Sequence, residues 1–262
     1  MSTTENLNVA LLQADLVWEN PKENKQRFEK KINQLSKNIH LIVLPEMFTS
    51  GFTMNAEDVA ETMSGATVQW MQKIALSKNM AITGSIVITE NKQFFNRLLF
   101  VHPSGKIDFY DKKHTFTLAG EGEVYSKGNQ KIIIDYKGWK ICPFICYDLR
   151  FPVWTRNTKN YDILLFVASW PKPRIDAWNT LLKARAIENM SYTIGVNRVG
   201  KDANNYEYTG NSACFDALGN SLIENTNSNE NSFIIELNKQ KQDIIRTKFN
   251  FLEDKDTFKI IP

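Results

Sequence analysis

Short apolar runs alternate with longer segments of mixed polarity along most of this chain. Four mostly apolar runs have the length of a buried strand: 8–14, 40–45, 81–88 and 161–168. Between them, 20–37 and 67–79 carry apolar residues three and four positions apart, which is the spacing of an amphipathic helix, and 175–189 reads as a further long helix. This alternation predicts a layered α/β protein with a mixed sheet.

The later part of the chain predicts further strands and a last helix. Strands are expected at 93–102, 131–136, 192–198, 210–216 and 232–237, and helices at 151–157 and 239–248. Pro103-Ser104-Gly105 predicts a turn, and Leu218-Gly219-Asn220 is a hairpin signal that would join the last two strands. With 262 residues, no repeat and no linker, we expect one domain over 1–262, with a core at 8–237 and a C-terminal helix and tail at 238–262.

Charge and composition narrow the class of protein. The 32 basic and 29 acidic side chains give a net charge of only +3, without a run of five like charges, so nucleic acid is not an expected partner. No stretch approaches the ~18 apolar residues of a membrane span. The first residues have no features of a secretory signal, and three cysteines cannot all pair within one chain. We therefore expect a cytoplasmic protein with free thiols.

Cys146 is the strongest candidate for chemistry. It ends an apolar stretch and opens the polar segment Tyr147-Asp148-Leu149-Arg150, whereas Cys142 and Cys214 have the context of buried core thiols. Cys142 and Cys146 lack a second Cys/His pair, so no zinc site is expected. Hydrolysis through a cysteine nucleophile requires no metal or organic cofactor, and none is expected. A thiol at its ordinary pKa of about 8.5 needs a base and a cation nearby to become a nucleophile.

Two other segments offer that base and that cation. Glu46 follows a buried strand among apolar neighbours, where partial desolvation suits a general base. Lys112 carries a positive charge that would stabilise a thiolate or an oxyanion, and Lys113 would point the opposite way in an extended segment. His114 leaves open a papain-like Cys–His pair, although a structural hydrogen-bonding role is the commoner one for such a histidine.

Three further groups have both a structural and a functional reading. Glu121 lies on a glycine-rich loop that is able to approach the site closely. Asp148 and Arg150 would pair with each other or with neighbours of the nucleophile. Arg185 and Glu188 are spaced for a structural ion pair on one helix.

Taken together, three motifs in this order resemble the nitrilase superfamily of carbon–nitrogen hydrolases. They are Leu44-Pro45-Glu46, the segment Tyr110 to Phe116, and Cys146-Tyr147-Asp148-Leu149-Arg150-Phe151-Pro152. The resemblance implies a four-layer α-β-β-α sandwich and a Cys/Glu/Lys triad. It makes Glu46 the general base, Lys112 the charge stabiliser, Cys146 the nucleophile and Glu121 a second glutamate that orients Lys112 and the substrate. Thr115 stands where the family often has leucine, which touches no catalytic atom.

Ala168-Ser169-Trp170-Pro171-Lys172-Pro173-Arg174, followed by Trp178, resembles the bacterial omega-amidase branch, although asparagine is more usual at position 169. That branch implies a 2-oxo dicarboxylate amide such as 2-oxoglutaramate or 2-oxosuccinamate as substrate. Another amide, an N-carbamoyl compound or a nitrile stays open within the enzyme class, and a thiol redox sensor or a catalytically dead binding scaffold outside it.

The implied substrate sets further expectations. The backbone N–H of Tyr147 would stabilise the oxyanion, Arg174 or Arg150 would bind the substrate carboxylate, and Trp170, Phe116 and Tyr147 are candidates for the apolar wall. The resemblance also implies a homodimer or larger homo-oligomer. Phe151, Val153 and Trp154, on a short helix after the nucleophile, would form the apolar contact.

Overall fold

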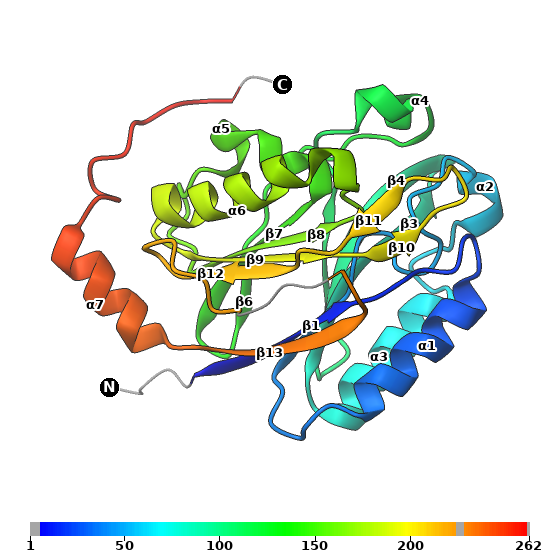
Figure 1. The fold of residues 1–262 in the computed structure, drawn as a ribbon, viewed down its shortest axis with the longest axis horizontal. Coiled ribbons are helices and arrows are strands. Elements are labelled where there is room, and N and C mark those ends of the chain that lie inside the picture. Colours follow the sequence, from blue (N-terminus) through cyan, green and yellow to red (C-terminus); the bar gives the residue numbers. More distant parts are fainter. Residues whose placement is uncertain (1–5, 224–227, 261–262) are drawn as a thin grey trace.

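The computed structural model describes residues 6–223 and 228–260 and contains two main β-sheets packed between helices (Figure 1). The six-stranded sheet has the order β13-β1-β2-β3-β4-β5 and the five-stranded sheet the order β12-β9-β8-β7-β6. The strands of the first are β1 (Leu7–Gln13), β2 (Leu41–Val43), β3 (Ala81–Glu90), β4 (Gln93–Val101), β5 (Ile107–Asp111) and β13 (Asn231–Leu237). Those of the second are β6 (Ile134–Tyr136), β7 (Trp139–Ile145), β8 (Ile163–Ala168), β9 (Tyr192–Asn197) and β12 (Ala213–Phe215).

Helices cover the outer face of each sheet. The six-stranded sheet carries α1 (Pro21–Asn33) and α3 (Ala66–Lys78), and the five-stranded sheet carries α5 (Pro152–Thr155) and α6 (Ile175–Asn189). The remaining helices are α2 (Ala56–Val59), α4 (Glu121–Val124) and α7 (Lys239–Phe249), with 3-10 turns at Thr117–Ala119, Cys146–Arg150 and Lys172–Arg174. The layers thus follow the order α-β-β-α that the sequence predicted.

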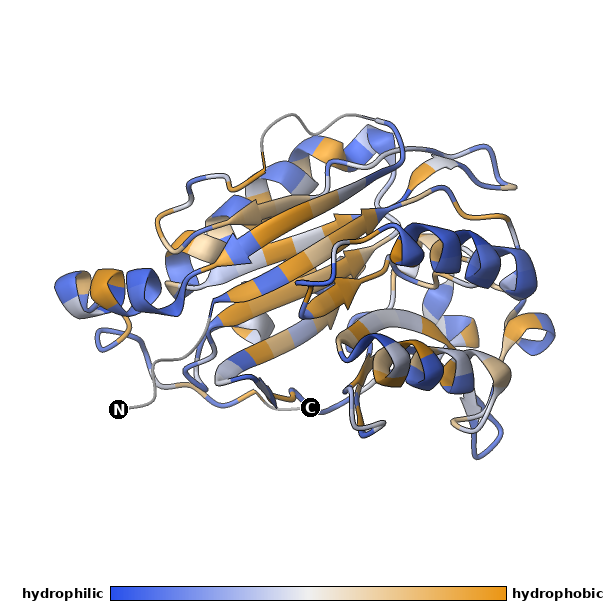
Figure 2. Ribbon diagram, turned by 90° about the horizontal axis from the view of Figure 1, so that it is seen from below, coloured by the Kyte–Doolittle hydropathy of each residue, from blue (hydrophilic) through white to orange (hydrophobic). Residues whose placement is uncertain are grey.

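The alternation of side chains along β1 explains why its sequence is apolar throughout. Val9 and Leu11 pack in the core between the two sheets, whereas Ala10 and Leu12 pack under α1 and α3. A strand buried on both faces reads as a continuous apolar run rather than an alternating one. The hydropathy colouring in Figure 2 shows the same division, with apolar strands inside and polar helix faces outside.

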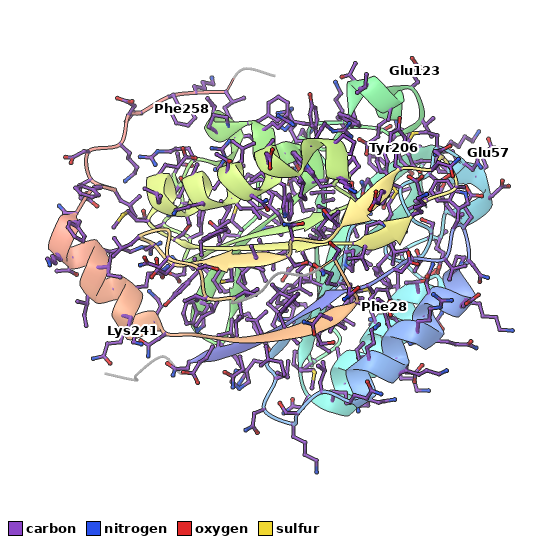
Figure 3. All side chains as sticks on the ribbon, in the orientation of Figure 1. Phe28, Glu57, Glu123, Tyr206, Lys241 and Phe258 are labelled. Atoms are coloured by element: carbon purple, nitrogen blue, oxygen red, sulfur yellow. The ribbon has the colours of Figure 1, made fainter. Side chains whose placement is uncertain are left out.

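Helix α1 shows how local sequence sets one of these elements. The Asn20 side chain accepts a hydrogen bond from the Glu23 N–H at 3.1 Å, and Pro21 occupies the first turn. Phe28, labelled in Figure 3, and Ile32 are each 1% exposed against the six-stranded sheet. The helix ends at Asn33, four residues before the predicted end at 37, because only polar side chains and Leu35 follow Ile32.

One prediction of pairing was wrong, and one strand was not predicted. Residues 210–216 and 232–237 do not form a hairpin: β12 pairs with β9 in one sheet and β13 with β1 in the other. The turn at Leu218-Gly219-Asn220 does form. The Asp216 N–H donates a hydrogen bond to the Asn220 carbonyl across it, at 2.9 Å. No strand was predicted for β5, which pairs with β4; Arg97 on β4 and Asp111 on β5 form an ion pair at 2.6 Å.

The small hairpin of β10 (Val199–Lys201) and β11 (Glu207–Thr209) was not predicted, since its residues are mostly polar. The predicted turn at 103–105 is confirmed, with Gly105 at φ +84°.

Within the described ranges, no helix is long and apolar enough to cross a membrane.

Candidate active site

Glu46, Lys112 and Cys146 follow the ends of three strands that belong to both sheets. Glu46 comes shortly after β2 and Lys112 directly after β5, both in the six-stranded sheet, and Cys146 directly follows β7 of the five-stranded sheet. The two sheets face each other across the core, so these strand ends meet at one rim. Residues up to 100 positions apart therefore share one site.

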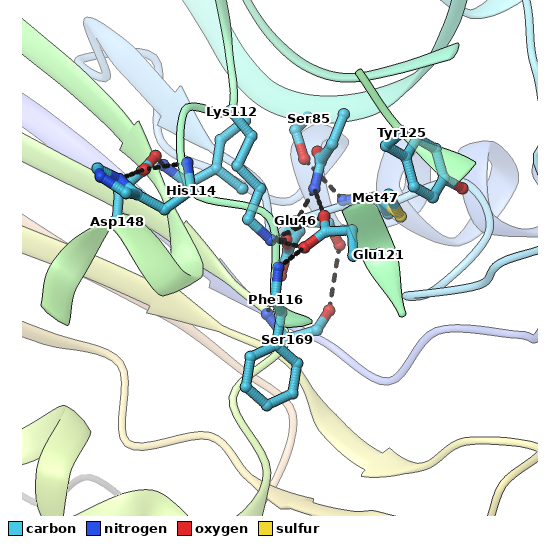
Figure 4. A network of polar contacts seen from close by, with 12 residues as sticks. Glu46, Met47, Ser85, Lys112, His114, Phe116, Glu121, Tyr125, Asp148 and Ser169 are labelled. Atoms are coloured by element: carbon cyan, nitrogen blue, oxygen red, sulfur yellow. Dashed lines mark hydrogen bonds and ion pairs between the residues drawn. The ribbon is translucent and has the colours of Figure 1, made fainter. Parts of the chain in front are cut away.

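Lys112 lies between two carboxylates at the centre of this site (Figure 4). Its Nζ is 2.9 Å from Glu46 Oε1 and 2.9 Å from both carboxylate oxygens of Glu121. All three side chains are at most 1% exposed. Burial alone would lower the pKa of Lys112, but the charges of Glu121 and Glu46 outweigh it and raise that pKa well above its ordinary value. Lys112 is therefore an ammonium ion under all ordinary conditions.

Glu121 is held as firmly as Lys112. Besides its bonds to the ammonium, it accepts a hydrogen bond from the Phe116 N–H at 2.5 Å. Burial raises the pKa of Glu121 and the neighbouring charge of Glu46 adds to this, while Lys112 opposes both. Glu121 thus contacts Lys112 directly, and its role in orienting Lys112 and the substrate stays a prediction.

Glu46 is oriented by partners that sequence reasoning missed. Asn96 Nδ2 donates to Glu46 Oε1 at 2.8 Å, and the Ser169 N–H donates to Oε2 at 2.8 Å. The Ser85 hydroxyl accepts from the N–H of Met47, whose φ of +43° turns the chain after Glu46. The sequence signal for Asn96 was weak: Asn96 and Arg97 are the two polar residues in the otherwise apolar run 94–101.

Cys146 occupies a turn that departs from ordinary backbone geometry. Its φ is +44°, a region that residues other than glycine rarely adopt and that recurs at functional turns. Burial raises the pKa of the Cys146 thiol well above its ordinary value, and the charge of Glu46 acts in the same direction, against the opposing charge of Lys112. The resting thiol is therefore protonated, with a carboxylate at hand to take its proton.

A cavity of about 400 Å³ opens over the thiol. Its lining includes Glu46, Lys112 and Cys146, and the aromatic side chains of Phe116, Tyr147 and Trp170. Eight of the nine side chains that the sequence nominated for the site line this cavity: Glu46, Lys112, Phe116, Cys146, Tyr147, Trp170, Arg150 and Arg174. Glu121 is the ninth and lies behind Lys112.

Two guanidinium groups face this cavity without a carboxylate partner. Arg150 lies 5.0 Å from the centre of the Trp170 ring, and Arg174 lies 5.0 Å from that of Phe116. Among the residues that the structure describes, neither forms an ion pair. Asp202 also lines the cavity, and its oxygens already accept bonds from Asn204, Tyr206 and Tyr208. The two guanidinium groups therefore favour an anionic group in the cavity.

His114 lies outside the cavity and does not support the papain-like alternative. Its Nδ1 is 2.7 Å from Asp148 Oδ1, and its ring stacks on Phe151 with centroids 3.6 Å apart. The Lys113 Nζ lies 5.5 Å from the centre of the Trp154 ring, away from the cavity as expected, although the chain bends at 113–114 and is not extended there. Asp148 does not pair with Arg150; it accepts hydrogen bonds from His114, the Tyr110 hydroxyl and the Ile145 N–H.

The other nominated groups have structural surroundings. Cys142 and Cys214 are fully buried, and burial raises the pKa of Cys142 to about 12. The Arg185–Glu188 ion pair forms at 3.0 Å, and Arg185 also donates to the Leu149 carbonyl at 2.7 Å. In the described part of the chain no cluster of three or more His, Cys, Asp or Glu residues is arranged to hold a metal ion.

Sequence comparison with known proteins matches the carbon–nitrogen hydrolase family over residues 8–246. The omega-amidase YafV of Escherichia coli K12 is 40% identical over 255 residues, which cover 97% of this chain and 98% of that protein. The 2-oxoglutaramate amidase of Bacillus subtilis 168 is 34% identical over 221 residues, 82% of this chain and 85% of that protein.

Solved structures of related proteins have the same fold. A carbon–nitrogen hydrolase superfamily protein of Xanthomonas campestris, with an arsenic adduct in its active site, superposes with a TM-score of 0.95 at 38% identity, covering 98% of this chain and 99% of that one. Nit3 of Saccharomyces cerevisiae, from branch 10 of the nitrilase superfamily, superposes with a TM-score of 0.84 at 23% identity, covering 94% and 95%. The predicted nitrilase-type sandwich is thereby confirmed.

Proposed function

Since the chain belongs to the carbon–nitrogen hydrolase family and is an amide-hydrolysing enzyme of it, we propose that it cleaves the ω-amide of a small 2-oxo dicarboxylate, such as 2-oxoglutaramate or 2-oxosuccinamate, to the acid and ammonia. The observation that carries this proposal is the cavity itself. Its lining includes a thiol, a carboxylate and an ammonium, together with two guanidinium groups that have no acidic partner. A short molecule with both an amide and a carboxylate matches these two sets of groups.

The first half of the reaction forms a thioester. Glu46 takes the Cys146 proton, and the sulfur attacks the amide carbon, so that a C–S bond forms and the carbonyl oxygen gains negative charge. The Lys112 ammonium and the Tyr147 N–H stabilise this oxyanion. Glu46 then gives its proton to the nitrogen, the C–N bond breaks, and ammonia leaves.

The second half returns the enzyme to its resting state. Water attacks the thioester carbon while Glu46 takes a proton from it. The C–S bond breaks, the acid is released, and Glu46 returns the proton to the Cys146 sulfur. Glu121 keeps Lys112 in place throughout, and every proton is accounted for by Glu46, Cys146 and water, without a metal or an organic cofactor.

Ammonia release from a panel of substrates tests the proposal. We expect kcat/KM to be highest for 2-oxoglutaramate or 2-oxosuccinamate and low for asparagine, glutamine, N-carbamoyl amino acids and simple nitriles. A preference for a carbamoyl compound or a nitrile would replace the proposed substrate. Thiol oxidation that changes binding, without ammonia release from any member of the panel, would favour a redox sensor.

Replacing the cavity arginines should reveal the carboxylate site. We expect Arg174→Met or Arg150→Met to raise KM for the 2-oxo dicarboxylate amide by about 10- to 100-fold, the equivalent of one lost charge-assisted hydrogen bond. The uncharged amide of similar length should be turned over as before. Lys172→Met is the matched control, since Lys172 pairs with Glu207 and does not line the cavity. Unchanged selectivity in both arginine variants would contradict this role.

We also propose that the protein is a cytoplasmic homodimer. The three free thiols agree with a reducing compartment. The apolar surface available for a contact is smaller than the sequence suggested. Trp154 is only 8% exposed and Phe151 stacks on His114, so Val153, at 56% exposure, is the one of the three that is largely exposed. Ile187 on α6, in the same helix layer, is 46% exposed.

Light scattering tests the dimer. At micromolar concentration we expect twice the chain mass of 30.2 kDa, and Val153→Asp should shift the mass toward the monomer by placing a charge in the contact. Leu76→Asp is the control, since Leu76 is 71% exposed on α3 in the opposite layer. A fully active wild-type monomer would refute the dimer.

A further inference from the structure

The buried carboxylate of Asp148 connects the segments that carry Lys112 and Cys146. Oδ1 accepts hydrogen bonds from the His114 N–H at 3.0 Å and from His114 Nδ1 at 2.7 Å. Oδ2 accepts from the Tyr110 hydroxyl at 2.8 Å and from the Ile145 N–H at 3.1 Å. Asp148 itself has no exposed surface. One carboxylate therefore receives four donors.

These donors flank the two reacting groups. Tyr110 and His114 stand two residues before and two residues after Lys112, and Ile145 directly precedes Cys146. Tyr110 belongs to β5 of the six-stranded sheet and Ile145 to β7 of the five-stranded sheet. The hydrogen bonds to Asp148 therefore link the two sheets. Figure 4 shows the His114–Asp148 pair beside the cluster formed by Glu46, Lys112 and Glu121.

The Tyr110 hydroxyl completes the link. It donates to Asp148 and accepts hydrogen bonds from the Lys113 N–H at 3.2 Å and from Trp154 Nε1 at 3.0 Å. Burial raises the pKa of Tyr110 well above its ordinary value, and the charge of Asp148 adds to this. The hydroxyl consequently remains a donor. The backbone of Lys112 is also fixed, because its N–H donates a hydrogen bond to the Asn96 carbonyl at 3.0 Å.

We propose that Asp148 is a positioning residue that sets the Lys112 ammonium and the Cys146 thiol at their working separation. It touches neither substrate nor reacting atoms. The proposal rests on the proposed function, since it assumes that Cys146 attacks and Lys112 stabilises the charge that develops. An error of about 1 Å in such a geometry costs about 10²-fold in rate.

Asp148→Asn is the direct test, because the amide is nearly isosteric yet has one acceptor oxygen where the carboxylate has two. Whichever way the amide turns, its NH₂ faces two of the four donors. We expect kcat to fall about 10²-fold with little change in KM, because alignment and not substrate binding is lost. Alkylation of Cys146 by iodoacetamide, measured without substrate, should also slow, because Lys112 no longer stabilises the thiolate.

Asp162→Asn is the matched control. Asp162 is 4% exposed and accepts from the Lys140 N–H, Arg246 and Lys239. It immediately precedes β8, at the opposite end of that strand from Ala168, the residue before Ser169 of the site. We expect a lower Tm with unchanged kcat and alkylation. If Asp148→Asn folds and keeps the kcat and alkylation rate of the wild type, or if Asp162→Asn loses as much kcat, Asp148 has no positioning role.

A second series decides the matter if Asp148→Asn does not fold. Tyr110→Phe and His114→Ala each remove one donor, and their combination should approach the loss expected for Asp148→Asn. His114→Asn restores a donor near the Nδ1 position and should recover the activity lost in His114→Ala. A double variant with wild-type kcat would overturn the proposal. The alkylation rates are independent of substrate, so a wrong substrate assignment and a wrong role for Asp148 give different results.

Discussion

Cys146→Ala should abolish amide hydrolysis while leaving the fold intact. The thiol carries the covalent step, and neither remaining cysteine is able to replace it, because Cys142 and Cys214 have no exposed surface in the core. Ammonia release should fall to background, with an unchanged circular dichroism spectrum and Tm. Cys142→Ala is the control: it leaves a small buried cavity, lowers Tm and keeps turnover.

Mass spectrometry of wild-type enzyme quenched during turnover should find the acyl group on Cys146. Trypsin cleavage after Lys140 and Arg150 leaves Cys142 and Cys146 on one peptide, so fragment ions must separate the two. An adduct on Cys142 or Cys214, or activity in Cys146→Ala, would sink the assignment of the nucleophile.

Glu46→Gln should lower turnover by about 10³-fold, within the range for loss of a general base. Glutamine keeps the shape and an acceptor for the Ser169 N–H, but it takes up no proton. His114→Ala should cost much less, since His114 lies outside the cavity. If His114→Ala were inactive and Glu46→Gln active, the Cys–His alternative would hold instead.

The same variant has a distinct effect on the thiol. The charge of Glu46 raises the pKa of Cys146, so its removal should lower that pKa and let the thiolate appear at lower pH. Alkylation of Cys146 measured against pH should therefore shift toward acid in Glu46→Gln although turnover collapses. A shift toward alkaline pH would show that Glu46 does not face the thiol as described.

The catalytic candidates were within reach of sequence reasoning because each has a local signature. Glu46 comes shortly after an apolar strand and Cys146 directly after one, and a polar residue at such a position is placed at the rim of a sheet. The partners of Glu46 have no such signature. Ser169 contributes a backbone N–H, which any residue provides, and Asn96 lies in the middle of a strand.

The partners of Asp148 also lacked a local sequence signature. Its position two residues after Cys146 could be read from the sequence, and pairing with Arg150 was expected because the two are close in sequence. The structure instead directs it toward Tyr110 and His114, which are 38 and 34 residues away. Arg150 turns to Trp170 and the cavity. Short-range pairing is a weak guide for a buried carboxylate, because burial demands enough donors to replace its water.

The sequence by itself determined the layered α/β class, most strands and helices, and the residues from which the site is built. Apolar runs and helical spacing are local properties, and burial follows from them directly. The tertiary structure decided which strands are neighbours. β13 pairs with β1, more than 200 residues earlier, and not with β12, because each sheet must complete its hydrogen bonds and cover its apolar face. Those long-range pairings bring Glu46, Lys112 and Cys146 to one rim and leave Arg150 and Arg174 facing the same cavity.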